Sequence, residues 1–343
     1  MSRKARIAVI GAGWWSTTAH LPAIIAHPDA ELTALVDADP ERLARAASAF
    51  GNPNTYTSLE ALLLTETVDA AVIATPHATH FALAQQCLDA GLHVLIEKPM
   101  TLYASEARAL QTSASGWEVI VGYPWNYTEQ AKTAREWVAS GRLGAIQYVT
   151  AIFSSYHLDL LSGATREATV HGPTTAYADP KLSGGGHGHL QITHIAGLLF
   201  FITDLQIARV QAQMTGFGLP LDVADAGLVT FDNGALGVMS GTSTAKRSRA
   251  LLRLDGEKGS LELDPLAGTL SFFGDETETL GPPEEIARTY PYKAPVENLI
   301  GVALGRETNQ CPAEVGCRAV ELLDALYRSA QSDGAAITLE DLQ

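Results

Sequence analysis

Arg6 to Ile24 reads RIAVIGAGWWSTTAHLPAI, and this stretch decides how the rest of the chain is interpreted. Its first part, Ile7 to Ile10, is an apolar, mostly β-branched run, which is typical of a strand buried on both faces. Gly11 and Gly13 follow at once, and a helix pattern begins after them. Strand, glycine turn and helix N-terminus in that order predict a site where backbone amides meet a pyrophosphate. Ser16 stands where the third glycine of G-x-G-x-x-G would be.

Asp37 supplies the second part of a dinucleotide site. It ends the next strand, Glu31 to Val36, at about the distance from Gly13 where dinucleotide folds place the carboxylate that binds the adenosine ribose. A carboxylate there repels the 2′-phosphate of NADP, and no Arg or Lys follows it directly, so the sequence predicts NAD rather than NADP. Trp14 and Trp15 are too bulky for a plain phosphate loop, and we expect one of them to stack on the cofactor or to close the cleft.

The composition narrows the class of protein. A chain of 343 residues suits two domains, and a content of 46% hydrophobic and 18% charged residues is typical of a soluble globular enzyme. A formal charge of −15 disfavours nucleic acid or an anionic membrane surface as the main partner. Three cysteines without a C-x-x-C pair fit a reducing compartment and predict no metal site. Because a strand begins near residue 5, leaving no room for a signal peptide, we expect a cytoplasmic protein without a membrane span.

Strand and helix alternate from the N-terminus to Tyr123. After Asp37, strands are predicted at Ala70 to Ala74, His93 to Ile96 and Glu118 to Val121. This rhythm predicts an α/β fold, a Rossmann doubly wound parallel sheet over residues 1–123, with ligands beyond the carboxyl ends of its strands. The groups that stand at these ends, and that we expect to line one crevice, are Gly11, Gly13, Asp37, Thr75, Pro76, His77, Glu97, Lys98, Gly122 and Tyr123.

In residues 124–343 the regular alternation of strands and helices stops. An alternating strand is predicted at 145–153, a long polar segment follows, and residues 187–202 are expected to be helical. Residues 226–240 form the clearest hairpin, with Asn233-Gly234 at its turn. The sequence therefore predicts a C-terminal α+β domain with a large, mostly antiparallel open sheet covered by helices on one side. Its open face suits a homo-oligomer, either a dimer or a tetramer.

The chain resembles the glucose–fructose oxidoreductase / inositol dehydrogenase (Gfo/Idh/MocA) family over essentially its full length. The motifs that carry the resemblance are the glycine turn, TPHATH at Thr75 to His80, EKP at Glu97 to Pro99, and GGG before a helix with a histidine, Gly184 to His194. The resemblance implies a nicotinamide-dependent enzyme that transfers hydride between a sugar or polyol hydroxyl and the cofactor. It also implies that Glu97 lies near the nicotinamide ribose and that His80 helps to shape the nicotinamide side.

Lys98 and His194 are the catalytic candidates. Hydride transfer needs a group that removes or returns the hydroxyl proton. A lysine can serve once burial or a nearby cation lowers its pKa, and otherwise it anchors a substrate oxygen. His187, Gln191 and His194 share one face of their helix, which predicts a polar cleft with His187 and Gln191 as substrate contacts.

Further substrate contacts are expected where the two domains meet. The candidates there are Trp125, Asn126, Tyr156 and His157, although the first two equally suit a packed hinge. In the long polar segment, the candidates for binding an anionic substituent are Arg166, His171 and Lys181.

Leu190 marks a departure from the family pattern. The family usually has an Asp four residues before the histidine of this helix, and here that position is Leu190, with Gln191 as the nearest polar residue. An Asp–His pair tunes a histidine as a base, which Leu190 cannot do. This keeps a second hypothesis open, an NAD-dependent glycosidase or lyase that oxidises a sugar transiently, eliminates a leaving group and returns the hydride. A protein that only senses NAD would share Asp37 but would not need Lys98 together with the polar helix face.

Overall fold

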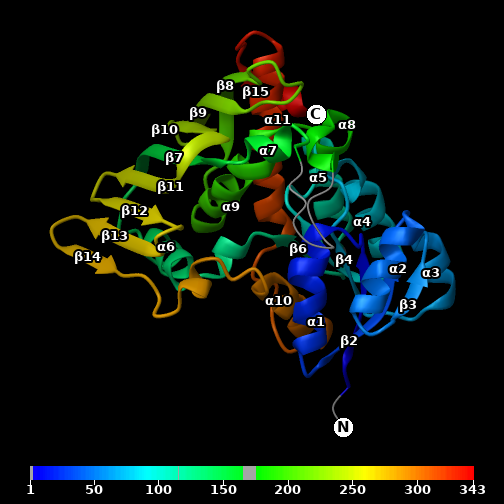
Figure 1. Ribbon diagram of the computed structural model, residues 1–343. Helices are drawn as coiled ribbons and strands as arrows, with labels where there is room; N and C mark the ends of the chain where they lie inside the picture. The colour runs from blue at the N-terminus through cyan, green and yellow to red at the C-terminus, as the bar shows by residue number, and fades with distance from the viewer. Residues whose placement is uncertain (1–2, 115, 165–174) are drawn as a thin grey trace.

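The computed structural model describes residues 3–114, 116–164 and 175–343, which form two sheets with helices packed around them (Figure 1). The N-terminal sheet is parallel, with the strand order β3-β2-β1-β4-β5-β6. Its strands are β1 (Ala5–Ile10), β2 (Ala30–Val36), β3 (Asn54–Tyr56), β4 (Ala70–Ile73), β5 (His93–Glu97) and β6 (Val119–Gly122). The predicted Rossmann sheet is confirmed, and its strand order reverses between β1 and β4, where such folds bind ligands.

The edge strand β3 is the strand of this sheet that the sequence did not predict. It has three residues, and both Asn54 and Thr55 are exposed. Because neither face of β3 is buried, the segment carries no apolar pattern from which a strand could be inferred.

Helices cover both faces of the parallel sheet. They are α1 (Leu21–Ala26), α2 (Pro40–Ala49), α3 (Leu59–Thr65), α4 (His80–Asp89) and α5 (Ala104–Ser113). Asp39 caps α2 by accepting hydrogen bonds from the amides of Glu41 and Arg42. A late segment, α10 (Ala294–Ala303), also packs against β1, β4, β5 and β6. The chain thus returns to the first sheet near its end, and the division at residue 123 remains a prediction.

The second sheet has nine strands in the order β14-β13-β12-β11-β7-β10-β9-β8-β15. Its strands are β7 (Ile146–Tyr156), β8 (Ile207–Thr215), β9 (Ala224–Phe231), β10 (Leu236–Thr242), β11 (Thr244–Gly256), β12 (Ser260–Asp264), β13 (Thr269–Phe273), β14 (Thr277–Leu280) and β15 (Ile337–Thr338). The β7–β10 pair is parallel and the other pairs are antiparallel. This confirms the mostly antiparallel sheet and the hairpin at Asn233-Gly234.

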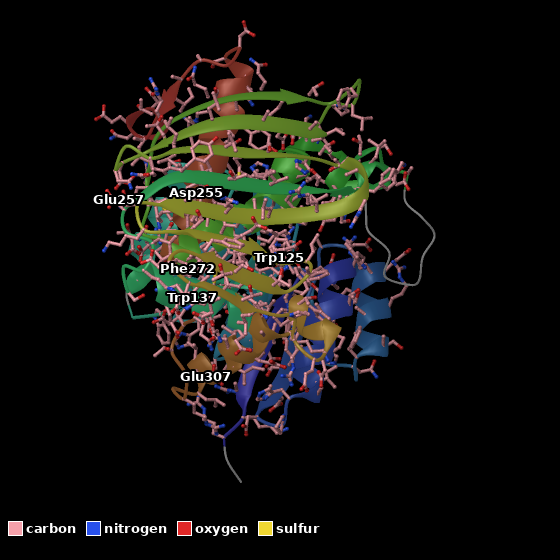
Figure 2. All side chains as sticks on the ribbon, turned by 90° about the vertical axis from the view of Figure 1, so that its left-hand side faces the viewer. Trp125, Trp137, Asp255, Glu257, Phe272 and Glu307 are labelled. Atoms are coloured by element: carbon pink, nitrogen blue, oxygen red, sulfur yellow. The ribbon has the colours of Figure 1, made fainter. Side chains whose placement is uncertain are left out.

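One face of the nine-stranded sheet is covered by α6 (Glu129–Ala139), α9 (Thr193–Ile202) and α11 (Ala313–Gln331). Figure 2 looks onto the opposite face, where strands lie in front of these helices. Exposed side chains there include Tyr148, Leu228 and Leu236. Of two short helices, α7 (Leu158–Leu161) and α8 (Pro180–Ser183), α8 packs against the turn at His77–Thr79 that follows β4. In the described ranges no helix has the length and the apolar composition needed to cross a membrane.

Both glycine-led helices begin with a π turn, at Ser16–His20 and at Gly188–Ile192. The sequence predicted ordinary helices at these places, because apolar periodicity does not distinguish i→i+5 from i→i+4 hydrogen bonds. π turns are rare and are concentrated at functional sites. Both of these turns lie next to the carboxyl end of β5, as the contacts below show.

Candidate active site

A cleft of about 710 Å³ runs past the carboxyl ends of β1, β2 and β4. Eight of the predicted cofactor residues line it: Gly11, Gly13, Trp14, Trp15, Asp37, Thr75, Pro76 and His77. Its opposite wall comes from the second half of the chain, from Ala176, Tyr177, Leu182 and Ser183. The volume lies within the range of small-molecule and cofactor sites.

The glycine turn fits a dinucleotide. Gly11 has a φ of 97°, and a Cβ there would stand 2.4 Å from the carbonyl oxygen of Ala74, so this position requires glycine. A Cβ on Gly13 would meet nothing within 4 Å, so the Gly13 backbone is open to approach. A helix begins just after it and directs its free amides outward. The turn therefore offers a pyrophosphate both backbone contact and a favourable dipole.

Asp37 is held by four donors. Oδ2 accepts from the amide of Ala12 at 2.8 Å and from Nε of Arg42 at 3.0 Å. Oδ1 accepts from the amide of Asp39 at 2.8 Å and from Nη2 of Arg42 at 3.0 Å. Arg42 was not predicted, because it does not follow Asp37 directly; the first turns of α2 bring it back to the carboxylate.

Glu97 ends β5 with its carboxylate firmly partnered. Oε1 accepts from Nε1 of Trp15 at 2.8 Å and from Nε2 of His20 at 2.9 Å, and Oε2 accepts from the amide of Lys98 at 3.2 Å. Burial acts to raise the pKa of Glu97, but the hydrogen bond and charge of His20, with the charge of Lys98, lower it below its ordinary value. Glu97 is therefore a fixed negative charge. The role of His20 was not predicted.

Lys98 follows Glu97 directly and is partly buried, and its Nζ donates to the carbonyl oxygen of Leu190 at 3.2 Å. Burial disfavours the ammonium ion and lowers the pKa of Lys98 to about 8, against the opposing charge of Glu97. A lysine with this pKa exchanges a proton near neutral pH, as a general acid or base must.

Lys98 lies among five histidines. Burial lowers the pKa of each of them, and the charge of Lys98 lowers it further; they are His77, His80, His157, His189 and His194. The strand end therefore carries one titratable ammonium within a group of neutral imidazoles.

The ring of His194 is surrounded by aromatic side chains. The rings of Trp125, Tyr290, Phe153 and Tyr123 lie between 5.5 and 6.4 Å from its own ring. Its Nδ1 is buried and has no hydrogen-bond partner among the described residues. Burial above all, then the charges of Lys98 and His157, hold the pKa of His194 well below its ordinary value. His194 is thus a neutral imidazole with hydrogen-bonding capacity to spare.

His157 and Gln191 form a second polar pair near Lys98. Nε2 of Gln191 lies 3.2 Å from Nδ1 of His157, which also lies 2.9 Å from Oγ of Ser155. Oε1 of Gln191 is buried without a partner in the part of the chain described. Burial, then the charge of Lys98, lowers the pKa of His157 to about 4.

Tyr156 and its neighbour His157 contact different residues. Side chains alternate along a strand, and the Tyr156 hydroxyl donates to Oδ1 of Asp159 while the ammonium of Lys246 lies 3.8 Å from the ring centre. The structure therefore brings His157, rather than Tyr156, next to Gln191 and Lys98.

Two of the remaining candidates, His187 and Asn126, are buried and hydrogen-bonded to other parts of the protein. His187 is fully buried, with Nδ1 2.8 Å from Oδ2 of Asp225 and Nε2 3.0 Å from the carbonyl oxygen of Phe153. Burial raises the pKa of Asp225 to about 7. Asn126 is equally enclosed and donates to the carbonyl oxygen of Gly197. The residues that line the 710 Å³ cleft include neither catalytic candidate and none of the predicted substrate contacts, so the roles of His187 and Asn126 stay predictions.

His77 and His80 brace the TPHATH turn. Nδ1 of His77 lies 2.9 Å from the carbonyl oxygen of Ser183 in α8. The ring of His80 spans the carbonyl oxygens of Pro99 and Thr75 at 2.9 and 3.0 Å. His80 therefore ties the end of β4 to the Glu97–Pro99 segment. Arg166 and His171 lie outside the described residues, and Lys181 is in α8.

Two family models match the chain. An oxidoreductase family with an NAD-binding Rossmann fold matches residues 5–123, and the GFO/IDH/MocA C-terminal domain matches residues 131–262. The chain belongs to the Gfo/Idh/MocA family. It is therefore an enzyme of a nicotinamide-dependent oxidoreductase family, and the predicted family resemblance is confirmed.

Similar proteins extend over nearly the whole chain. D-xylose 1-dehydrogenase (NADP(+)) 2 of Haloferax volcanii is 27% identical and covers 97% of this chain and 99% of its own length. D-apiose dehydrogenase of Paraburkholderia graminis is 27% identical over 98% of this chain and 90% of its own length. The crystal structure of GenD2 from gentamicin A biosynthesis, in complex with NAD, is 26% identical with a TM-score of 0.79, over 98% of this chain and 97% of that chain.

Within this Gfo/Idh/MocA enzyme, Leu190 has a role that its side chain did not suggest. The side chain is buried with Leu161, Leu221 and Val223, while the carbonyl oxygen accepts the hydrogen bond from Lys98. A backbone carbonyl thus stands beside Lys98 at Leu190, the position where the family resemblance implies an aspartate.

Proposed function

We propose that this enzyme is an NAD-dependent dehydrogenase that oxidises a hydroxyl group of a sugar or polyol, with Lys98 as the proton-transfer group. The observation that carries the proposal is the position of Lys98, at a strand end of the dinucleotide domain, with a pKa near 8. The names of its relatives support a sugar or polyol as the substrate class.

In the proposed reaction the neutral amine of Lys98 takes the hydroxyl proton of the substrate and becomes an ammonium ion. The C–H bond on the same carbon breaks with its electron pair, and a carbonyl group results. The bound nicotinamide supplies the acceptor for the departing hydride. The carboxylate of Glu97 is adjacent to the positive charge that appears on Lys98, so it stabilises the protonated product of the step.

His194, His157 and Gln191 complete the proposed substrate site. His194 is neutral and offers a ring nitrogen to a substrate hydroxyl, while Oε1 of Gln191 offers an unused acceptor. Buried polar atoms without partners are costly, and a polyhydroxylated ligand would satisfy them. Trp125, packed beside His194, gives this pair an apolar wall of the kind that sugars contact with their C–H faces.

The test is to incubate the protein with NAD⁺ and a panel of free sugars, polyols and aryl glycosides, following NADH absorbance and aglycone release in parallel. We expect stoichiometric NADH with a sugar or polyol, and its loss in Lys98→Met. Release of an aglycone that depends on NAD⁺ but accumulates no NADH would replace this proposal with the transient-oxidation glycosidase or lyase. Neither signal with any compound would contradict both.

The uncovered sheet face supports a proposal about assembly. Tyr148, Leu228 and Leu236 are exposed on neighbouring strands and would be buried by a second copy of the chain. We therefore propose a homo-oligomer through this face, which light scattering on Leu228→Asp tests by the loss of the assembled species. The three cysteines are free and buried, which supports a cytoplasmic location.

A further inference from the structure

The pair of Asp37 and Arg42 changes what the adenosine end of the cleft can bind. A carboxylate has about four lone-pair positions, and Asp37 receives four donors: two from Arg42 and the amides of Ala12 and Asp39. The free acceptor that a ribose hydroxyl would need is therefore already used. The charge that would repel a 2′-phosphate is offset by a bidentate cation.

Arg42 has N–H donors that the ion pair with Asp37 does not use and that could bind a ligand. Nε and Nη2 are used by Asp37, and no group in the described ranges accepts a hydrogen bond from Nη1. The side chain is 34% exposed and lines the cleft. Two residues with hydroxyl groups, Thr57 and Ser58, line the same end. Guanidinium and hydroxyl donors together are typical of a phosphate site.

We infer that Arg42 is the residue that sets cofactor selectivity, and that it allows this enzyme to bind NADP as well as NAD by pairing with the 2′-phosphate. The inference rests on the proposed function, since it requires a dinucleotide in the cleft. It also revises the reason for expecting NAD alone, because Asp37 does not face the cofactor as a free carboxylate.

Asp39 is the charge that acts against this inference. Its carboxylate lies 3.9 Å from Nη2 of Arg42, and its side chain is 43% exposed. It is engaged with the amides of Glu41 and Arg42 at the start of α2. Solvent screens its repulsion of a phosphate more strongly than it screens the closer attraction of Arg42.

The experiment measures NADH and NADPH binding by quenching of tryptophan fluorescence, which Trp14 and Trp15 in the cleft make sensitive. The variants are Arg42→Gln, Arg42→Lys and, as a matched control on the same helix, Arg45→Gln. Arg45 is paired with Glu41 at 3.7 Å and is exposed. Thermal unfolding of each variant verifies that it is folded.

We expect the wild type to bind both cofactors with Kd values within about tenfold of each other. Arg42→Gln should weaken NADPH by more than about tenfold and NADH by less than about threefold, because only NADPH loses a charge-assisted contact. Arg42→Lys should retain most NADPH binding, and Arg45→Gln should behave as the wild type.

Three results overturn the inference while leaving the proposed function intact: tight NADH binding without NADPH binding, equal weakening of both cofactors in Arg42→Gln, or the same loss in Arg45→Gln. If the wild type binds neither cofactor, the proposed dehydrogenase fails together with the inference.

Discussion

The helix that follows Gly13 and the helix that begins at Gly188 start in the same way. They contact adjacent residues, Glu97 and Lys98, at the carboxyl end of β5. Each follows a glycine turn and starts with a π turn. From the first, Trp15 and His20 donate to Glu97, so this carboxylate is fixed by protein donors. From the second, one backbone carbonyl meets Lys98, and side-chain atoms of the same helix remain without partners in the described structure. The first helix thus fixes a charge, while the second leaves hydrogen-bonding groups for a ligand.

The largest effect is expected at Lys98. Lys98→Met should lower kcat/KM for sugar or polyol oxidation by about 10²- to 10⁴-fold, the usual contribution of a proton-transfer group. The Kd for NADH should change little, because the residues that line the cleft are untouched. Steady-state kinetics together with cofactor titration tests this. A Lys98→Met enzyme with nearly normal kcat would place proton transfer elsewhere.

The same residue sets the expected pH dependence in the wild type. The amine must be neutral to accept a proton, and the pKa of Lys98 is lowered to about 8 by burial. Oxidation should therefore be slow below this pH, rise through it and level off above it. In the reverse direction the ammonium form is required, so carbonyl reduction should fall over the same range.

Two alanine substitutions, one in each glycine turn, should distinguish a structural role from a cofactor contact. A Cβ on Gly186 would stand 2.0 Å from the carbonyl oxygen of Asp222, whose carboxylate also accepts from the amides of Gly186 and Gly188. Gly186→Ala should cost about 2–4 kcal/mol in the free energy of unfolding, measured with denaturant. Gly13→Ala meets open space and should leave stability within about 0.5 kcal/mol. Its effect should appear instead as weaker NADH binding. Similar losses of stability in both variants would show that the first turn is structural rather than a cofactor contact.

The contrast between these turns also shows what the sequence could predict. Glu97 and Lys98 were found because buried strands leave apolar runs, and the residues that end parallel strands meet at one edge of a sheet. Arg42, His20 and the pairing of His157 with Gln191 depend on which side chains fold back across space. Arg42 is the fifth residue after Asp37, and no local sequence pattern predicts that their charged groups form an ion pair. The enclosure of His187 depends likewise on its contacts with Phe153 of β7 and Asp225 of β9, and that of Asn126 on its contact with Gly197 of α9.

Gln191 tests whether the second helix is prepared for a ligand. Its Oε1 is buried and unpaired in the described structure, so Gln191→Leu removes an unsatisfied acceptor together with the Nε2 contact to His157. Because these two changes act in opposite directions, the free energy of unfolding should stay within about 1 kcal/mol of the wild type. Its kcat/KM should nevertheless fall about tenfold, chiefly through KM, since one good hydrogen bond corresponds to about that factor. Lower stability with unchanged kinetics would assign Gln191 to the scaffold.

Glu97 gives the smallest and most specific effect, because its carboxylate acts on the reaction through Lys98. The negative charge of Glu97 raises the pKa of Lys98 against the effect of burial, so Glu97→Gln should lower that pKa further. The rise of oxidation rate with pH should move to lower pH by no more than about one unit, which corresponds to about 1.4 kcal/mol. Glu118→Gln is the matched control, because Glu118 is exposed at the opposite end of the neighbouring strand. An unmoved profile in Glu97→Gln would mean that the group titrating near pH 8 is not Lys98. A shift in the same direction in Glu118→Gln would attribute the effect to net charge rather than to the residue that the first helix fixes.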